Sequence, residues 1–237
     1  MINMGGKVLF VAGAGKGLGR AIAHKFGSAG ASVFIADIDS ECGEGTAAEF
    51  RDSGMKAKFC KLDLCNESDI QRAVLNCVSE FGGLDVLVNS ARPQLKVQPF
   101  PDSMSEWDMA MQVLLKAPAL TIAAALPELA RSGKGSIINI SSTNAYQISH
   151  QPLSYHVAKS AILQLTRQLA YELGPKGIRV NAICPGLIEP MLKKEAYVPH
   201  SSFKQLVTEK VVPLVGTTAS LFINTHSTLF NILLNLI

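Results

Sequence analysis

The sequence predicts an α/β fold in which helices cover both faces of a doubly wound parallel sheet. Short apolar segments alternate with longer segments of helical periodicity, an order that builds a parallel sheet with right-handed crossovers. Glycines follow the first apolar segment, and polar or acidic residues follow most of the others. Because the carboxyl ends of parallel strands meet at one edge of a sheet, we expect these residues to form a ligand site there.

The first half of the chain alternates strands with helices. Residues 7–12 (KVLFVA) form a continuous apolar run, which is typical of a parallel strand covered on both faces. Residues 20–28 then place alanine, isoleucine and phenylalanine at the spacing of a helix that packs on a sheet. The same two patterns repeat, with strands expected at 32–36 and 57–62 and helices expected at 40–51 and 67–81.

The second half continues this order. A strand expected at 84–88 leads to a long helical stretch at 105–131, in which Pro118 and Pro127 are expected to kink or end the helix. The remaining elements are expected to be a strand at 135–140, a helix at 155–173 and a strand at 178–183.

The composition favours one large globular domain that binds small molecules. A chain of 237 residues with 48% hydrophobic and 17% charged residues can bury a full core. The net charge of +3 is small, and the lysines and arginines are scattered, so neither nucleic acid nor an anionic membrane is an expected partner.

The cysteines and the amino terminus indicate the compartment. The five cysteines form no Cys-x-x-Cys pair and no cluster with the histidines, so we expect free thiols and no metal site. The amino terminus enters the first strand without the pattern of a signal peptide. The expected location is the cytoplasm.

Tyr155 and Lys159 are the most informative pair of residues. They lie four residues apart on one face of the predicted helix 155–173, and so are expected to be neighbours. A free phenol, with a pKa of about 10, is a poor base at neutral pH, and a nearby cation favours the phenolate. Tyr155 is therefore a candidate proton donor and acceptor that Lys159 tunes. Alternatively, the pair belongs to an ordinary amphipathic helix.

A serine is a candidate for the same cleft. The expected strand 135–140 ends at Ser141-Ser142, and Ser142 lies thirteen residues before Tyr155, so its hydroxyl could reach the same cleft. The alternative is an ordinary turn residue.

A glycine-rich turn separates the first strand from the first helix. Gly13, Gly17 and Gly19, with Lys16 and Leu18 between them, have the spacing G-x-x-x-G-x-G. Such a turn lets the backbone approach a pyrophosphate and directs the N–H groups of a helix start toward it. A tight connection without a ligand is the alternative.

Asp37 follows the second strand, where a carboxylate can accept both ribose hydroxyls of an adenosine and repel a 2′-phosphate. Lys16 instead favours NADP, since an ammonium group inside the glycine turn could bind a 2′-phosphate. We expect NAD as the cofactor, with NADP less favoured. The alternative for Asp37 is a cap of helix 40–51, for which Asp39 and Ser40 are equally good candidates.

Taken together, these residues resemble the short-chain dehydrogenase/reductase family over roughly residues 5–215. The resemblance implies a Rossmann-like sheet that binds a nicotinamide dinucleotide, and an oxidoreductase that transfers hydride between the cofactor and a secondary alcohol or ketone. It implies that Tyr155 exchanges the proton, Ser142 holds the substrate oxygen and Lys159 binds the nicotinamide ribose. The implied cofactor-binding residues are Gly13, Lys16, Gly17, Leu18, Gly19, Asp37, Asp63, Leu64, Asn89, Tyr155, Lys159, Pro185, Gly186 and Ile188.

The chain departs from the family at several site positions. Ala12 replaces a threonine that steadies the glycine turn, and Arg92 stands where the family keeps a glycine against the cofactor. Leu114 aligns with an asparagine that anchors a water linking the lysine to solvent, and Pro190 aligns with a threonine that holds the nicotinamide carboxamide. The alternative function is therefore a catalytically weak or inactive cofactor-binding protein with a regulatory or interaction role.

The carboxyl-terminal tail is atypical. We expect a catalytic domain at 1–216 and an apolar tail of the same domain at 217–237, which carries no charged side chain and no Asp-Gly-Gly motif. Frequent Thr, Ser, Asn and His residues argue against a membrane span. The sheet could lack the family's seventh strand, which puts the typical homo-oligomer in doubt.

Overall fold

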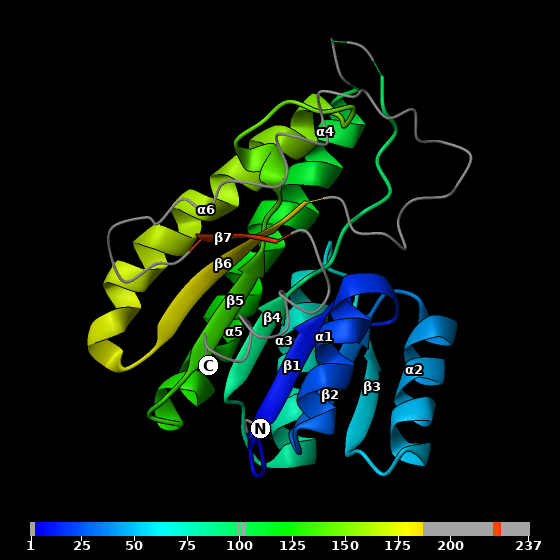
Figure 1. Cartoon of the computed structure of the whole chain (residues 1–237), viewed down its shortest axis with the longest axis vertical. Helices are drawn as coiled ribbons and strands as arrows, with labels where there is room; N and C mark the ends of the chain where they lie inside the picture. Colours follow the sequence, from blue (N-terminus) through cyan, green and yellow to red (C-terminus); the bar gives the residue numbers. More distant parts are fainter. Residues whose placement is uncertain (1–2, 99, 101–102, 187–219, 224–237) are drawn as a thin grey trace.

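One sheet of seven parallel strands runs through the protein, in the order β3-β2-β1-β4-β5-β6-β7 (Figure 1). The computed structural model describes residues 3–98, 100, 103–186 and 220–223, the last four by their backbone alone. The strands are β1 Val8–Ala12, β2 Ser32–Asp37, β3 Ala57–Lys61, β4 Val86–Asn89, β5 Ser136–Ile140, β6 Arg179–Pro185 and β7 Ser220–Ile223.

Helices cover both faces of this sheet, which confirms the predicted doubly wound α/β class. Helices α1 and α2 pack on one face, and α3, α5 and α6 pack on the other (Figure 1). The helices are α1 Gly17–Ser28, α2 Ser40–Asp52, α3 Glu67–Phe81, α4 Met104–Met111, η1 Gln112–Lys116, α5 Ala117–Arg131, η2 Thr143–Ala145, α6 Leu153–Leu173 and η3 Gly174–Lys176.

The apolar run of β1 is buried on both sides because side chains alternate along a strand. Phe10 and Ala12 belong to the core under α3 and α5, whereas Leu9 and Val11 belong to the core under α1 and α2. All four are at most 1% exposed. The strand order reverses between β1 and β4, and this switch point is where ligands bind in open parallel sheets.

The long stretch from Met104 to Arg131 continues through both prolines, where the sequence predicted a kink or an end. Helix α4 passes into the π-helical turn η1, and α5 follows with Pro118 in its first turn and Pro127 inside it. Proline has no N–H for the carbonyl four residues earlier, so the wider turn before Pro118 accommodates the missing hydrogen bond.

By length and composition, the described part of the chain contains one helical stretch that could cross a membrane, again Met104–Arg131. The core helix of a soluble protein passes the same test. In this protein, the stretch places Ala117, Ile122, Ala125 and Leu129 in the core beneath the sheet.

The tail supplies a short seventh strand, where the sequence predicted that this strand could be missing. The backbone of β7 pairs in parallel with β6, from Ala182 opposite Ser220 to Pro185 opposite Ile223. Strand pairing uses backbone N–H and C=O groups, so it does not depend on an Asp-Gly-Gly motif. The proposed division at residue 216 and the rest of the tail lie outside the described residues.

Candidate active site

The glycine turn approaches its neighbours closely. Gly13 has a φ of +82°, and a Cβ atom built on it would lie 2.4 Å from Cα of Ala91. A Cβ atom on Gly19 would lie 1.9 Å from the carbonyl oxygen of Gly13. Only glycine fits these two positions, because any side chain would collide with the backbone.

The start of α1 beside this turn is open. Lys16 caps the helix without a side-chain hydrogen bond, and the first turn contains no acidic residue. A Cβ atom on Gly17, whose φ is +61°, would meet nothing within 4 Å. The first N–H groups of α1 therefore remain available to an anion.

The turn is steadied by a threonine that the sequence reasoning missed. The buried Thr46 hydroxyl of α2 donates to the Gly15 carbonyl at 2.9 Å. This hydrogen bond holds the turn that Ala12 cannot hold with its methyl group. Because the two residues are 31 positions apart, only the fold brings them together.

Asp37 lies at the end of β2 and faces the glycine turn. Its Oδ2 accepts a hydrogen bond from Gly15 N at 2.8 Å, and its Oδ1 accepts one from Asp39 N at 3.1 Å. A carboxylate has about four acceptor sites, so acceptor capacity remains for ribose hydroxyls. The cap of α2 is Asp39, whose Oδ1 accepts from Cys42 N at 3.0 Å.

The charge of Lys16 is directed toward Asp39. Its Nζ lies 3.5 Å from Asp39 Oδ2, with both side chains substantially exposed. The backbone N–H of Cys42 and, more weakly, Lys16 hold the pKa of Asp39 below its usual value.

Other polar residues at the carboxyl edge stabilise the turns that follow the strands. Asp63 Oδ1 accepts from Cys65 N at 2.8 Å, and the Leu64 carbonyl accepts from Gln112 Nε2 at 3.0 Å. Asn89 Nδ2 donates to Asn139 Oδ1 at 2.9 Å, which joins the ends of β4 and β5.

Lys159 is buried and tied to the end of β5. Its Nζ donates to the Ile140 carbonyl at 2.7 Å, and the Ser141 hydroxyl donates to the Lys159 carbonyl at 2.7 Å. Nζ also lies 5.7 Å from the centroid of the Tyr155 ring, so the predicted proximity of these two side chains is observed. Ser142, the next residue after this anchor, is 8% exposed, and its Oγ accepts from Asn144 N at 3.2 Å.

Burial lowers the pKa of Lys159 to about 7, from an ordinary value of 10.5, because the protein interior disfavours the charged form. The positive charge of Arg92 lowers this pKa further, and Cys184 acts weakly in the opposite direction. The buried site therefore disfavours the protonated form of Lys159, and a nearby anion would stabilise that form.

Arg92 points to the tyrosine. Its Cζ lies 5.3 Å from the centroid of the Tyr155 ring, and its Nη2 donates to Gln151 Oε1 at 2.9 Å. The neighbouring Ala91 is the residue that contacts the glycine turn. The long cation that the sequence predicted against the cofactor is thus directed toward Tyr155, the candidate proton donor and acceptor.

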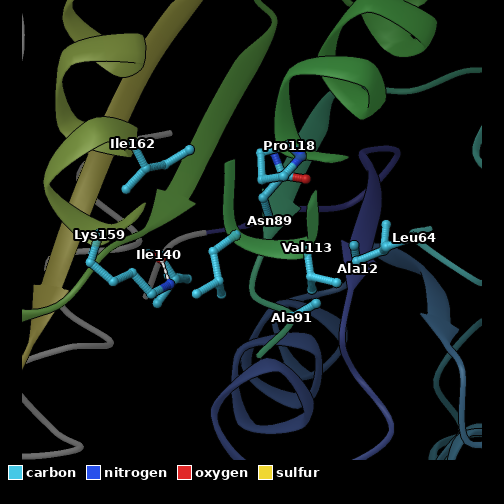
Figure 2. A pocket seen from close by; sticks show the side chains of 10 residues that line it. Ala12, Leu64, Asn89, Ala91, Val113, Pro118, Ile140, Lys159 and Ile162 are labelled. Atoms are coloured by element: carbon cyan, nitrogen blue, oxygen red, sulfur yellow. Dashed lines mark hydrogen bonds between the residues drawn. The ribbon is translucent and has the colours of Figure 1, made fainter. Parts of the chain in front are cut away.

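Leu114 closes a small cavity beneath the site. It is 2% exposed and packs with Ala110, Tyr155 and Ala158. Figure 2 shows Lys159 and Ile140 reaching this cavity from one side and Ala12 and Leu64 from the other. The cavity has about 10 Å³ of free space, close to the minimum for one water molecule. It is lined by Ala12, Leu64, Asn89, Ala91, Val113, Leu114, Pro118, Ile140, Lys159 and Ile162.

Among the remaining sequence-predicted residues, Pro185 ends β6 and is buried, and Gly186 follows it. Ile188 and Pro190 lie outside the described residues. All five cysteines, including the buried Cys184, are free.

The parallel sheet with an open helix start at its switch point is that of an α/β dinucleotide-binding protein. The chain belongs to the short-chain dehydrogenase family, because the family described as short chain dehydrogenase matches residues 7–198. Members of this family are oxidoreductases that use a nicotinamide cofactor and act on small molecules.

Curated relatives agree with this assignment. The chain is 35% identical over 207 residues to a 2,5-dichloro-2,5-cyclohexadiene-1,4-diol dehydrogenase of Sphingobium indicum, covering 87% of this chain and 82% of that protein. It is 35% identical over 210 residues to a 3-alpha-(or 20-beta)-hydroxysteroid dehydrogenase of Mycobacterium tuberculosis, covering 88% and 78%.

A solved structure shows the same fold. It is a gluconate 5-dehydrogenase from Burkholderia cenocepacia in complex with NADP and tartrate, which superimposes with a TM-score of 0.80 at 24% identity and covers 94% of this chain and 95% of that one.

Proposed function

We propose that the protein transfers hydride between NAD(H) and a secondary alcohol or ketone, with Tyr155 as the proton donor and acceptor. The observation that carries this proposal is the buried Lys159 beside the Tyr155 ring, anchored by its Nζ to the Ile140 carbonyl. A buried ammonium group is costly, and no core helix needs one for packing. The names of the two relatives, a ring-diol dehydrogenase and a hydroxysteroid dehydrogenase, support an alcohol substrate.

The residues have distinct roles in this proposal. The phenol oxygen of Tyr155 takes the hydroxyl proton of the alcohol, or returns it to the ketone oxygen. The Ser142 oxygen accepts from Asn144 N, so its own hydrogen can be donated to the substrate oxygen. Protonated Lys159 has three donors, of which the Ile140 carbonyl takes one. The others are proposed to hold the nicotinamide ribose.

The glycine turn and Asp37 at the end of β2 fit a nicotinamide dinucleotide, which would carry the hydride in this reaction. The N–H groups at Gly17, Leu18 and Gly19 would hold its pyrophosphate, and Asp37 would accept the adenosine ribose hydroxyls. NAD is favoured over NADP in this proposal because two carboxylates, Asp37 and Asp39, lie at the end of β2, where their charge would repel a 2′-phosphate. Lys16 is paired with Asp39, which leaves little attraction for such a phosphate.

The remaining residues expected at the cofactor lie along the same edge of the sheet. They are Gly13, Asp63, Leu64, Asn89, Pro185 and Gly186.

Tyr155→Phe tests the proposed chemistry. We expect turnover to fall at least a hundredfold, within the range for loss of a general acid–base group. NADH affinity, measured by fluorescence titration, should stay within about threefold, since the ring and its packing remain. The assay follows nicotinamide absorbance with a panel of secondary alcohols and ketones. Retained turnover in this variant would refute the assigned role.

Leu114 favours a second candidate function, a cofactor-binding protein with weak catalysis. Its apolar side chain lines the cavity next to Lys159, at a position where a polar side chain could hold a water molecule for proton exchange. A rise in melting temperature with NADH, without turnover of any panel compound, would favour this candidate over the oxidoreductase.

A further inference from the structure

Arg92 covers the tyrosine of the proposed active site. The guanidinium group lies over the ring of Tyr155, which is only 7% exposed, whereas Arg92 itself is exposed. Its hydrogen bond to Gln151, 59 residues away, fixes the group across the loop that precedes α6. The guanidinium is therefore held beside the ring of Tyr155.

The surroundings of Tyr155 carry positive charge without a matching carboxylate. Arg92 and Lys159 both lie within 6 Å of the ring centroid. Within the described ranges, every ion pair involves other residues, so neither cation has a carboxylate partner within 4.0 Å. Among the described residues, the side chain that hydrogen-bonds Arg92 is Gln151, whose neutral oxygen uses one of the five N–H donors.

We propose that Arg92 binds a carboxylate of the substrate, so that the protein acts on short hydroxy acids or the matching keto acids. The free donors of a guanidinium fit a carboxylate in bidentate geometry, and a bound anion would offset the repulsion between the two cations. The carbinol carbon would then lie at Tyr155 and Ser142, with the acid group beside it. This inference rests on the proposed function and names its substrate class.

The cofactor phosphates are a less suitable partner for this arginine. The glycine turn lies against the backbone of Ala91, whereas the side chain of the next residue extends to Tyr155 and Gln151. A role in cofactor binding would nevertheless weaken NADH affinity in an Arg92 variant, so that affinity is measured as one arm of the test.

The test compares acids with their neutral amides. We expect kcat/KM to favour lactate over lactamide, or beta-hydroxybutyrate over its amide, by at least tenfold. Arg92→Met should reduce kcat/KM for the preferred acid by about thirtyfold while leaving the amide and cyclohexanol within threefold, because loss of a bidentate charged pair affects only the anion. For Arg92→Lys, we expect kcat/KM for the preferred acid to lie between the values of the wild type and of Arg92→Met. Lys176→Met, which removes an exposed charge in η3, directly after α6, is the control for net charge.

Several results would overturn this inference. They are a preference for neutral alcohols, an equal loss for acids and neutral substrates in Arg92→Met, and a loss of NADH affinity that accounts for the whole effect. If no substrate is turned over, the proposed function fails, and malonate titrated into the NADH complex by calorimetry tests the carboxylate site alone. Binding that weakens at least tenfold in Arg92→Met supports the site. Absent or unchanged binding refutes it.

Discussion

Replacing Lys159 with methionine should change how the stability of the cofactor-free protein depends on pH. Burial lowers the pKa of Lys159 from 10.5 to about 7, so the folded protein loses this proton near neutral pH. The unfolded chain keeps the same proton until much higher pH. Between these two values the unfolded state binds more protons, and the free energy of unfolding of the wild type therefore rises with pH.

The size of the effect follows from this pKa. One pKa unit corresponds to about 1.4 kcal/mol, so the titration of Lys159 should add about 2 kcal/mol to the free energy of unfolding between pH 7 and pH 9. Lys159→Met lacks this contribution. We expect the variant to be more stable than the wild type at pH 6, where the buried charge is present, and this advantage to shrink as the pH rises.

Urea unfolding, followed by circular dichroism at intervals from pH 6 to pH 9, measures this difference. Subtracting the free energy of unfolding of the variant from that of the wild type at each pH cancels most of the pH dependence that the cysteines contribute, because both proteins contain them. Lys176→Met is the matched control for the loss of a lysine side chain, because it removes a lysine from an exposed position. A constant difference for Lys159→Met would mean that the folded protein keeps the proton, and the assigned burial effect would be refuted.

Further variants test the cofactor site and the cavity. Asp37→Asn keeps an acceptor for Gly15 N but removes the charge, so the ratio of NADPH to NADH affinity should rise about tenfold or more by fluorescence titration, and an unchanged ratio would contradict the NAD preference. Leu114→Asn should raise kcat about tenfold, while the lost apolar burial lowers the free energy of unfolding by about 2 kcal/mol. No gain in kcat would show that the cavity does not limit proton exchange. Gly19→Ala should abolish cofactor binding and destabilise the fold by at least about 2 kcal/mol, since its Cβ would lie 1.9 Å from the Gly13 oxygen. Gly45→Ala in α2, with nothing within 4 Å, should instead stabilise by about 0.5–1 kcal/mol, and similar urea midpoints for the two variants would contradict the steric argument.

The order of elements could be predicted from the sequence because it depends on local periodicity. Continuous apolar runs give buried parallel strands, and residues four apart on a helix share a face. The Tyr155–Lys159 pair and the glycine turn are therefore evident in the order of residues alone. The seventh strand is not, because backbone pairing to β6 needs no particular side chain in the tail.

The environment of these residues was decided by the tertiary structure. Thr46 reaches Gly15, Arg92 reaches Tyr155 and Gln151, and Leu114 is brought against the tyrosine by a π-helical turn. Each contact joins segments far apart in the chain, so no local pattern reports it. The low pKa of Lys159 has the same origin, because desolvation depends on everything packed around the amine. The sequence by itself determined which groups could do chemistry, whereas their charge states and neighbours came from folding, since burial and long-range contacts exist only in the folded chain.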